Sequence, residues 1–121
     1  MRRGKTRTLV GMATERYPTP DGLLELLVVR EDGDVSIGFD GYSWHTHADV
    51  LVAEYELIGE SVKTPDEAVR RFLHDLQSNV ARIVVLRKAG KVHDVWAVVG
   101  QPEDDKYLEA DETQEIRYWG K

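Results

Sequence analysis

The residues best suited to chemistry lie in one short stretch, residues 38–49, which carries two histidines, two carboxylates and several aromatic rings. His45, His47 and Asp49 follow the pattern His-x-His-x-Asp. Imidazole nitrogens and carboxylate oxygens are ligands that zinc and other divalent transition metals take in proteins. The stretch therefore predicts a candidate metal site, to which His93 adds a further ligand if its strand lies beside the segment.

The His-x-His-x-Asp pattern resembles part of the metal-binding motif of metallo-β-lactamases. That motif continues with another histidine directly after the aspartate, where this chain has Val50, and the chain is shorter than that fold requires. The histidine pair is also similar to the His-x-His of cupin barrels, but Glu54 is farther along the chain than the next cupin ligand. Each resemblance covers only this segment, so we assign the chain to neither family.

Two catalytic alternatives use the same stretch. Asp40 and Asp49 could form an acid–base pair, which needs two carboxyl groups at a fixed separation with different pKa values. Ser43, His45 and Asp49 contain the groups of a hydrolase relay, although relay partners are seldom neighbours in sequence. The chain has 22 acidic residues and therefore many chance pairings. We expect the two histidines to be ordinary polar residues at a helix entrance.

Composition narrows the class of protein. The chain has 121 residues, a formal net charge of −6 and no cysteine. This length fits one domain, and the absence of cysteine suits a reducing cytoplasm. The negative charge disfavours a nucleic-acid partner, because phosphate contacts need clustered lysine and arginine. No apolar run approaches the roughly 20 residues that cross a membrane, so we expect a soluble cytoplasmic protein.

The apolar pattern predicts six strands and two helices in the order β-β-β-α-α-β-β-β. The predicted strands are 6–14, 23–30, 35–39, 81–88, 92–99 and 116–119, with a turn over 17–22. The predicted helices are 47–57, capped by Thr46, and 65–78, capped by Thr64. In an alternative, 45–49 is a strand that places His45, His47 and Asp49 on one face.

These elements predict one α+β domain over residues 1–121. We expect an antiparallel or mixed sheet with the two central helices packed on one face. Residues 1–5 are predicted to be a mobile basic arm, and residues 101–114 an acidic surface loop. No glycine-rich phosphate loop follows a strand, which argues against a nucleotide-binding fold.

Aromatic and acidic residues indicate a protein partner. Tryptophan and tyrosine are common in interface hot spots, although Trp44 and Trp96 are expected to anchor the core as well. The predicted partner-binding residues are Tyr42, Trp44, Glu103, Asp104, Asp105, Asp111, Glu112 and Trp119. An acidic surface attracts a basic partner by electrostatic steering.

The leading hypothesis is a non-enzymatic protein-binding module of bacterial character that docks on a basic partner. Immunity proteins, which neutralise toxins, have this general make-up. The second hypothesis is a metal-binding enzyme or sensor that uses His45, His47 and Asp49, with a metal-activated water as the reactive group. The third is a regulatory domain that dimerises through an exposed strand. The expected state is a monomer or a homodimer.

Overall fold

The computed structural model describes residues 13–100 and 108–120, which form seven strands and two helices. The strands are β1 (Ala13–Pro18), β2 (Glu25–Glu31), β3 (Asp34–Phe39), β4 (His45–His47), β5 (Arg82–Lys88), β6 (Lys91–Val98) and β7 (Glu112–Arg117). The helices are α2 (Ala48–Leu57) and α3 (Pro65–Gln77), and they lie between β4 and β5 in the chain. The predicted α+β class is confirmed.

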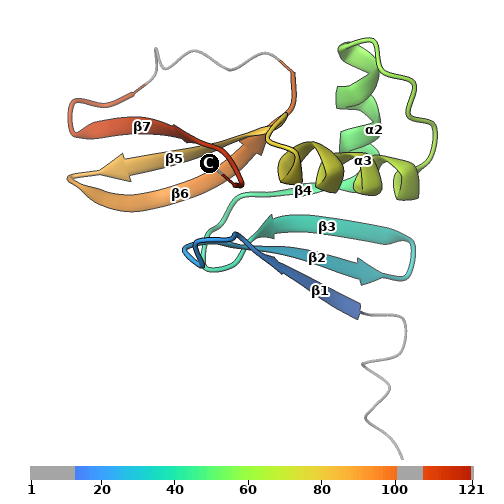
Figure 1. Cartoon of the computed structure of the whole chain (residues 1–121), viewed down its shortest axis with the longest axis horizontal. Coiled ribbons are helices and arrows are strands. Elements are labelled where there is room, and N and C mark those ends of the chain that lie inside the picture. Colours follow the sequence, from blue (N-terminus) through green and yellow to red (C-terminus); the bar gives the residue numbers. More distant parts are fainter. Residues whose placement is uncertain (1–12, 101–107, 121) are drawn as a thin grey trace, which may run out of the picture.

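The strands form two antiparallel sheets, which Figure 1 shows as two separate groups of strands. The first sheet has the order β1-β2-β3-β4, and the second has the order β6-β5-β7. The sequence predicts about six strands but not this division into two sheets. The additional strand is the short β4, which pairs with β3 so that Ser36 lies opposite His47.

Tight turns fix the register of the hairpins. Gly33, with a φ of 78°, allows the reversal that places Glu31 opposite Asp34 at the end of β2 and β3. Ala89 and Gly90 both have positive φ, as the two central residues of a two-residue hairpin turn with matching twist require. The predicted turn over 17–22 is shorter in the structure, because β1 continues through Pro18.

Helix α3 follows its predicted signals closely. The Thr64 side chain accepts a hydrogen bond from the Glu67 backbone N–H at 3.1 Å, and Pro65 occupies the first turn. The chain leaves the helix through Asn79, whose φ of 65° is left-handed. One buried stripe contains Ala68, Val69, Phe72 and Leu76. The apolar spacing therefore gives the same helix in sequence and structure.

The sequence left open whether the histidine segment is a strand over 45–49 or the start of a helix over 47–57, and the structure contains a part of each. Residues 45–47 are a strand and residues 48–57 are a helix. The predicted cap, Thr46, is wrong: its side chain is buried in β4, and His47 occupies the cap position without a side-chain cap bond. Thr46 lies opposite Ile37, on the face of the sheet that faces the core.

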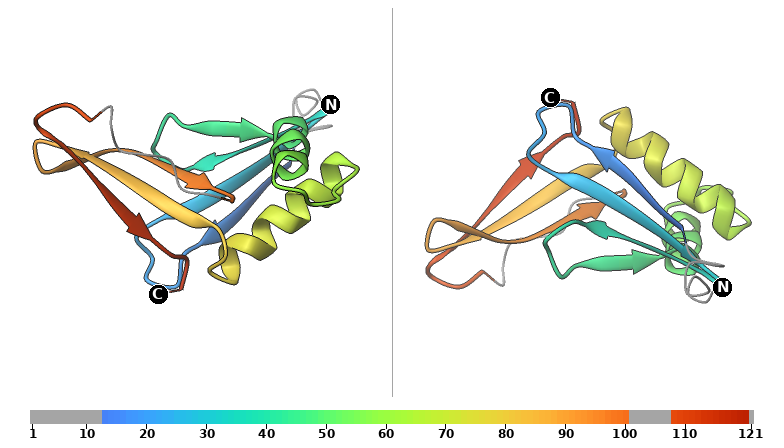
Figure 2. Two further views of the ribbon diagram at one scale, coloured as in Figure 1. Left: turned by 90° about the horizontal axis from the view of Figure 1, so that it is seen from above. Right: turned by 90° about the horizontal axis from the view of Figure 1, so that it is seen from below.

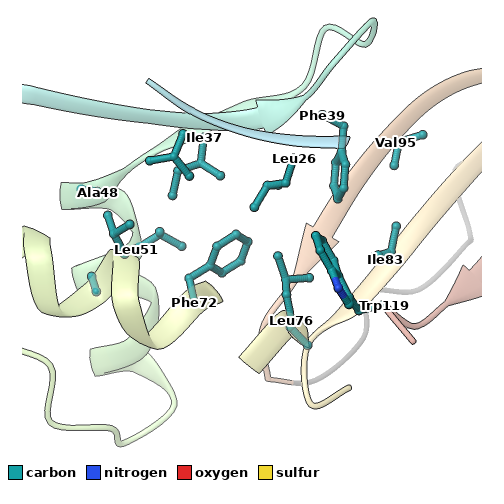
Figure 3. Close-up of a cluster of buried hydrophobic side chains, with 14 of the residues drawn as sticks. Leu26, Ile37, Phe39, Ala48, Leu51, Phe72, Leu76, Ile83, Val95 and Trp119 are labelled. Carbon is teal, nitrogen blue, oxygen red and sulfur yellow. The ribbon is translucent and has the colours of Figure 1, made fainter. Parts of the chain in front are cut away.

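Both sheets and both helices contribute to one hydrophobic core. Figure 3 shows Phe72 and Leu76 of α3 beside Leu26 of the first sheet, with Ile83 and Trp119 toward the second sheet. The two further views in Figure 2 show the helices gathered at one end of the sheets. The opposite face of the first sheet carries His45 and His47, so the histidines lie away from this core.

Several boundaries differ from the predictions at the two ends of the chain. The first strand is described only from Ala13, and the predicted basic arm 1–5 lies outside the described residues. The predicted acidic loop 101–114 is wrong at its end, because β7 begins at Glu112. No helix among the described residues is long and apolar enough to cross a membrane.

Candidate functional site

The described residues form an open groove of about 680 Å³. It lies between the β2–β3 turn and the first turns of α2 and α3. Its ionisable lining residues are Glu31, Asp34, Asp49, Asp66 and Arg30. The remaining lining is small or apolar, so four carboxylates and one guanidinium dominate its chemistry.

Local structure explains why these carboxylates meet. The turn at Gly33 brings Glu31 and Asp34 opposite each other. Asp49 and Asp66 lie in the first turns of α2 and α3, where the helix dipole favours negative charge. The Asp49 Oδ1 atom also accepts the Val50 backbone N–H at 3.0 Å. Each acid thus has a local reason for its position, and the fold brings three separate segments together.

The one arginine in the groove is already paired. Arg30 Nε lies 3.2 Å from Glu15 Oε2, and its Nη1 lies 3.3 Å from Asp66 Oδ1. Hydrogen bonds and charges from Glu15 and Asp66 outweigh burial, which alone would lower the pKa of Arg30, and the pKa is raised. Arg30 therefore stays protonated and its charge is offset by two acids. Glu31, Asp34 and Asp49 leave the groove with an excess of negative charge.

A histidine, an aspartate and a serine meet beside the groove. His47 Nδ1 lies 3.1 Å from Asp34 Oδ2 and 3.3 Å from Ser36 Oγ. Both contacts fall on the same ring nitrogen. A hydrolytic relay instead needs the aspartate on one ring nitrogen and the nucleophile on the other. This arrangement holds the His47 ring against β3 but does not activate Ser36.

The predicted metal ligands are only partly brought together. The rings of His45 and His47 lie 5.2 Å apart between centroids, edge to face. Asp49 is in the first turn of α2, and His93 is on β6 in the other sheet. Among residues 13–100 and 108–120, no three histidine, cysteine, aspartate or glutamate side chains form a group that could hold a metal ion. The predicted four-residue ligand set is therefore not assembled.

The predicted partner-binding residues are scattered. Tyr42 and Trp44 are half-buried and pack against the core. Trp119 is only 8% exposed, so the prediction that it faces a partner is wrong. Asp111 and Glu112 lie at the start of β7. Glu103, Asp104 and Asp105 lie outside the described residues.

A lysine offsets part of the acidic end of β7. Lys88 Nζ lies 2.8 Å from Glu109 Oε1, and this hydrogen bond and charge lower the pKa of Glu109. Charges of Asp111 and Glu112 also act on Lys88. The groove is therefore a stronger concentration of negative charge than this part of the C-terminal region.

Sequence reasoning missed most of the groove. Residues 31–34 fall between two predicted strands and Asp66 falls at the start of a predicted helix, and neither position is predicted to belong to a site. The signals for a shared site were present, since a hairpin end and two helix starts all carried acids. Comparison of the chain with known protein families, with curated proteins and with solved structures finds no match. The site therefore has to be interpreted from its own chemistry.

Proposed function

We propose that this protein is a non-enzymatic protein-binding module whose acidic groove receives a basic segment of another protein. One observation carries the proposal: four carboxylates line a groove of about 680 Å³ whose single guanidinium is already paired. A lysine or arginine side chain entering this groove would meet an excess of negative charge. Such complementarity raises association rates and rejects acidic competitors.

The groove is suited to a peptide segment more than to one small ion. It is open, and its acids come from a hairpin and two helices, so successive cationic side chains could contact different walls. Arginine pairs with carboxylates through two parallel hydrogen bonds, which favours arginine-rich segments. An inhibitor of the immunity type, which covers a basic surface of a toxin, is the specific form that we propose.

A binding experiment can separate the groove from the overall charge. The probe is an acetylated, amidated peptide of alternating arginine and glycine, measured by isothermal titration calorimetry. The groove variant is Asp34→Lys/Asp49→Lys. The control variant is Asp40→Lys/Glu56→Lys, which changes two exposed acids outside the groove and alters the net charge equally.

We expect the groove variant to weaken binding at least about tenfold, since two charge contacts become repulsive. The control variant should change affinity by about twofold or less, and added salt should reduce the difference. Equal weakening by both variants would show that only net charge attracts the peptide, and the proposal would be wrong. Citrulline in place of arginine, which keeps the shape without the charge, should abolish binding to the wild-type protein.

A further inference from the structure

His45 and His47 form a pair on the outer face of the first sheet, in its edge strand β4. Side chains alternate along a strand, so both rings lie on this face while Thr46 between them is buried toward the core. The β3 residues directly opposite the pair are Gly38 and Ser36, which are small and leave room for the rings. The ring centroids are 5.2 Å apart and the ring planes are at 85°.

Hydrogen bonds place the proton of each neutral ring on Nδ1. His47 Nδ1 lies 3.1 Å from the Asp34 carboxylate. His45 Nδ1 lies 3.3 Å from the backbone carbonyl oxygen of Ser43. A carboxylate and a carbonyl oxygen only accept hydrogen bonds, so each Nδ1 carries the hydrogen. The Ser36 hydroxyl fits this scheme, because it donates to Asp34 at 3.4 Å and its oxygen accepts from His47 at 3.3 Å. In both rings Nε2 is therefore the nitrogen with the lone pair.

Histidines that bind metals are held in the same way. A carboxylate or a backbone carbonyl accepts the hydrogen of one ring nitrogen, and the other nitrogen binds the metal. The spacing of the rings also fits one tetrahedral ion. A zinc ion about 2.0 Å from each Nε2 would lie about 3.2 Å from each ring centre, and at an angle of about 109° the two centres would be about 5.2 Å apart. The observed separation of the centroids is 5.2 Å.

We infer that His45 and His47 bind zinc, or a divalent transition metal with the same preference, through Nε2, and that two copies of the chain share one ion. A closed tetrahedral zinc site has four protein ligands. Within residues 13–100 and 108–120, no group of three or more potential ligands is assembled, so one copy supplies only the pair. A two-fold axis through the ion brings the same pair from a second copy and completes four imidazoles.

The test is a zinc titration of the untagged full-length chain near neutral pH, followed by calorimetry and by sedimentation velocity. We expect one zinc ion to bind per two chains, and the monomer to become a dimer as zinc is added. A chelator should restore the monomer. The inference goes beyond the proposed function and does not rest on it. Asp34 lines the acidic groove as well as orienting His47, but the titration contains no peptide.

Two matched double variants locate the ligands, because the chain has four histidines. His45→Ala/His47→Ala should lose both zinc binding and the zinc-dependent dimer. His74→Ala/His93→Ala, which changes the two histidines outside the pair, should keep both. Asp34→Asn should weaken zinc affinity about tenfold, as the loss of a carboxylate that orients a metal-binding histidine does. Circular dichroism and urea denaturation check that each variant is folded.

Three results would overturn the inference. Zinc binding that survives the loss of both histidines would place the ion on other groups, such as the carboxylates of the acidic groove. One ion per chain, or binding without a change in sedimentation, would show that no second copy completes the site. An unchanged zinc affinity in Asp34→Asn would show that this carboxylate does not prepare His47 as a ligand. Each of these results is independent of the arginine–glycine peptide, whose binding tests the proposed function separately.

Discussion

Two groups of carboxylates in this protein have opposite surroundings. Asp75 on α3 is 5% exposed and receives the Tyr55 hydroxyl hydrogen at 2.8 Å and the Arg71 Nε hydrogen at 3.1 Å. Arg71 also pairs with Glu60 and lies over the Tyr55 ring, 5.3 Å from its centroid. The carboxylates of the acidic groove are exposed, and within residues 13–100 and 108–120 only Asp34 and Asp66 among them have an ion-pair partner.

The difference concerns what each charge can do. A buried charge is costly unless its partners are built into the fold, so Asp75 is committed to joining α2 and α3. An exposed charge costs little and remains available to a partner. Burial also raises the pKa of Tyr55, with further increases from the Asp75 hydrogen bond and charge, so the phenol stays protonated and donates. One cluster therefore stabilises, and the other is suited to recognition.

The largest expected effect is the loss of the buried carboxylate. Asp75→Ala removes the acceptor of Tyr55 and leaves a buried hydroxyl without a partner. It also removes one of the two acids that bind Arg71. We expect the free energy of unfolding to fall by about 3 kcal/mol, the order found when one partner of a buried pair is removed. Urea denaturation measures this directly.

A substitution that removes only one hydrogen bond of the Tyr55–Asp75–Arg71 network should have a smaller effect on stability. Tyr55→Phe keeps the ring beneath Arg71 but removes the hydroxyl that donates to Asp75. The expected loss is about 1–2 kcal/mol, as for a hydrogen bond to a charged group. If Tyr55→Phe costs as much as Asp75→Ala, the ion pair with Arg71 contributes nothing. A loss below about 0.5 kcal/mol would contradict a structural role for the hydroxyl.

Neutralisation of acids in the groove should weaken peptide binding and leave the stability of the fold almost unchanged. Glu31→Gln/Asp34→Asn leaves the helices and the core unchanged, so the free energy of unfolding should change by about 0.5 kcal/mol or less. The same variant should bind the arginine–glycine peptide about three- to tenfold more weakly, since two favourable charges are lost. Denaturation and calorimetry on one protein sample measure both quantities. A large stability loss with unchanged binding would show that these acids are structural.

Helix α3 could be predicted almost in full because its signals are local. The cap Thr64, the proline at Pro65 and the terminator Asn79 all act within a few residues of the helix ends. The apolar spacing between them leaves one consistent face. The α+β class follows from the same local patterns, because strands and helices occur in separate blocks of the chain.

Strand β7 was predicted too late in the chain, as 116–119 instead of Glu112–Arg117, because the charges of its first residues have distant partners. Its sequence, Glu-Thr-Gln-Glu-Ile-Arg, resembles a solvated loop when considered alone. In the structure Glu112 lies opposite Lys88, and Glu115 lies 3.0 Å from Arg87, both across the β5–β7 pairing. Trp119 follows the strand directly into the core. Pairing across 24 or more residues cannot be deduced from the strand's own composition.

The candidate site was missed for a related reason. Its acids come from a hairpin turn and two helix starts, and each has a sufficient local explanation. The histidines, by contrast, form an obvious sequence pattern, but the antiparallel pairing of β4 with β3 places His47 against Asp34 and Ser36. Reactive residues that are neighbours in the sequence therefore did not identify the candidate site. Its acids come from separate segments that only the tertiary structure brings together.

Asp21 lies between the two groups, because its carboxylate is exposed but has several partners. Thr19 Oγ1 donates to it at 2.6 Å, the Leu23 backbone N–H donates at 3.0 Å, and Arg117 forms an ion pair with it. The Thr19 hydrogen bond, then the Leu23 bond and Arg117, lower the pKa of Asp21 from 3.8 to about 2. Arg117 belongs to β7, so this pair connects the β1–β2 turn with the second sheet.

The lowered pKa of Asp21 predicts a small, pH-dependent contribution to stability. The folded state binds this proton less readily than the unfolded state, so the contribution is complete above about pH 4 and is lost as the pH falls toward 2. Asp21→Asn should therefore be less stable than wild type at pH 6 and should approach it near pH 2. Asp32→Asn, in the exposed β2–β3 turn, is the control and should show no such convergence.

A difference between wild type and Asp21→Asn that stays constant over this range would mean that the side chain contributes only its shape and neutral hydrogen bonds. Convergence would show that an exposed carboxylate with built-in partners behaves like Asp75 in kind, and that partners rather than burial alone distinguish a structural acid from one available for binding.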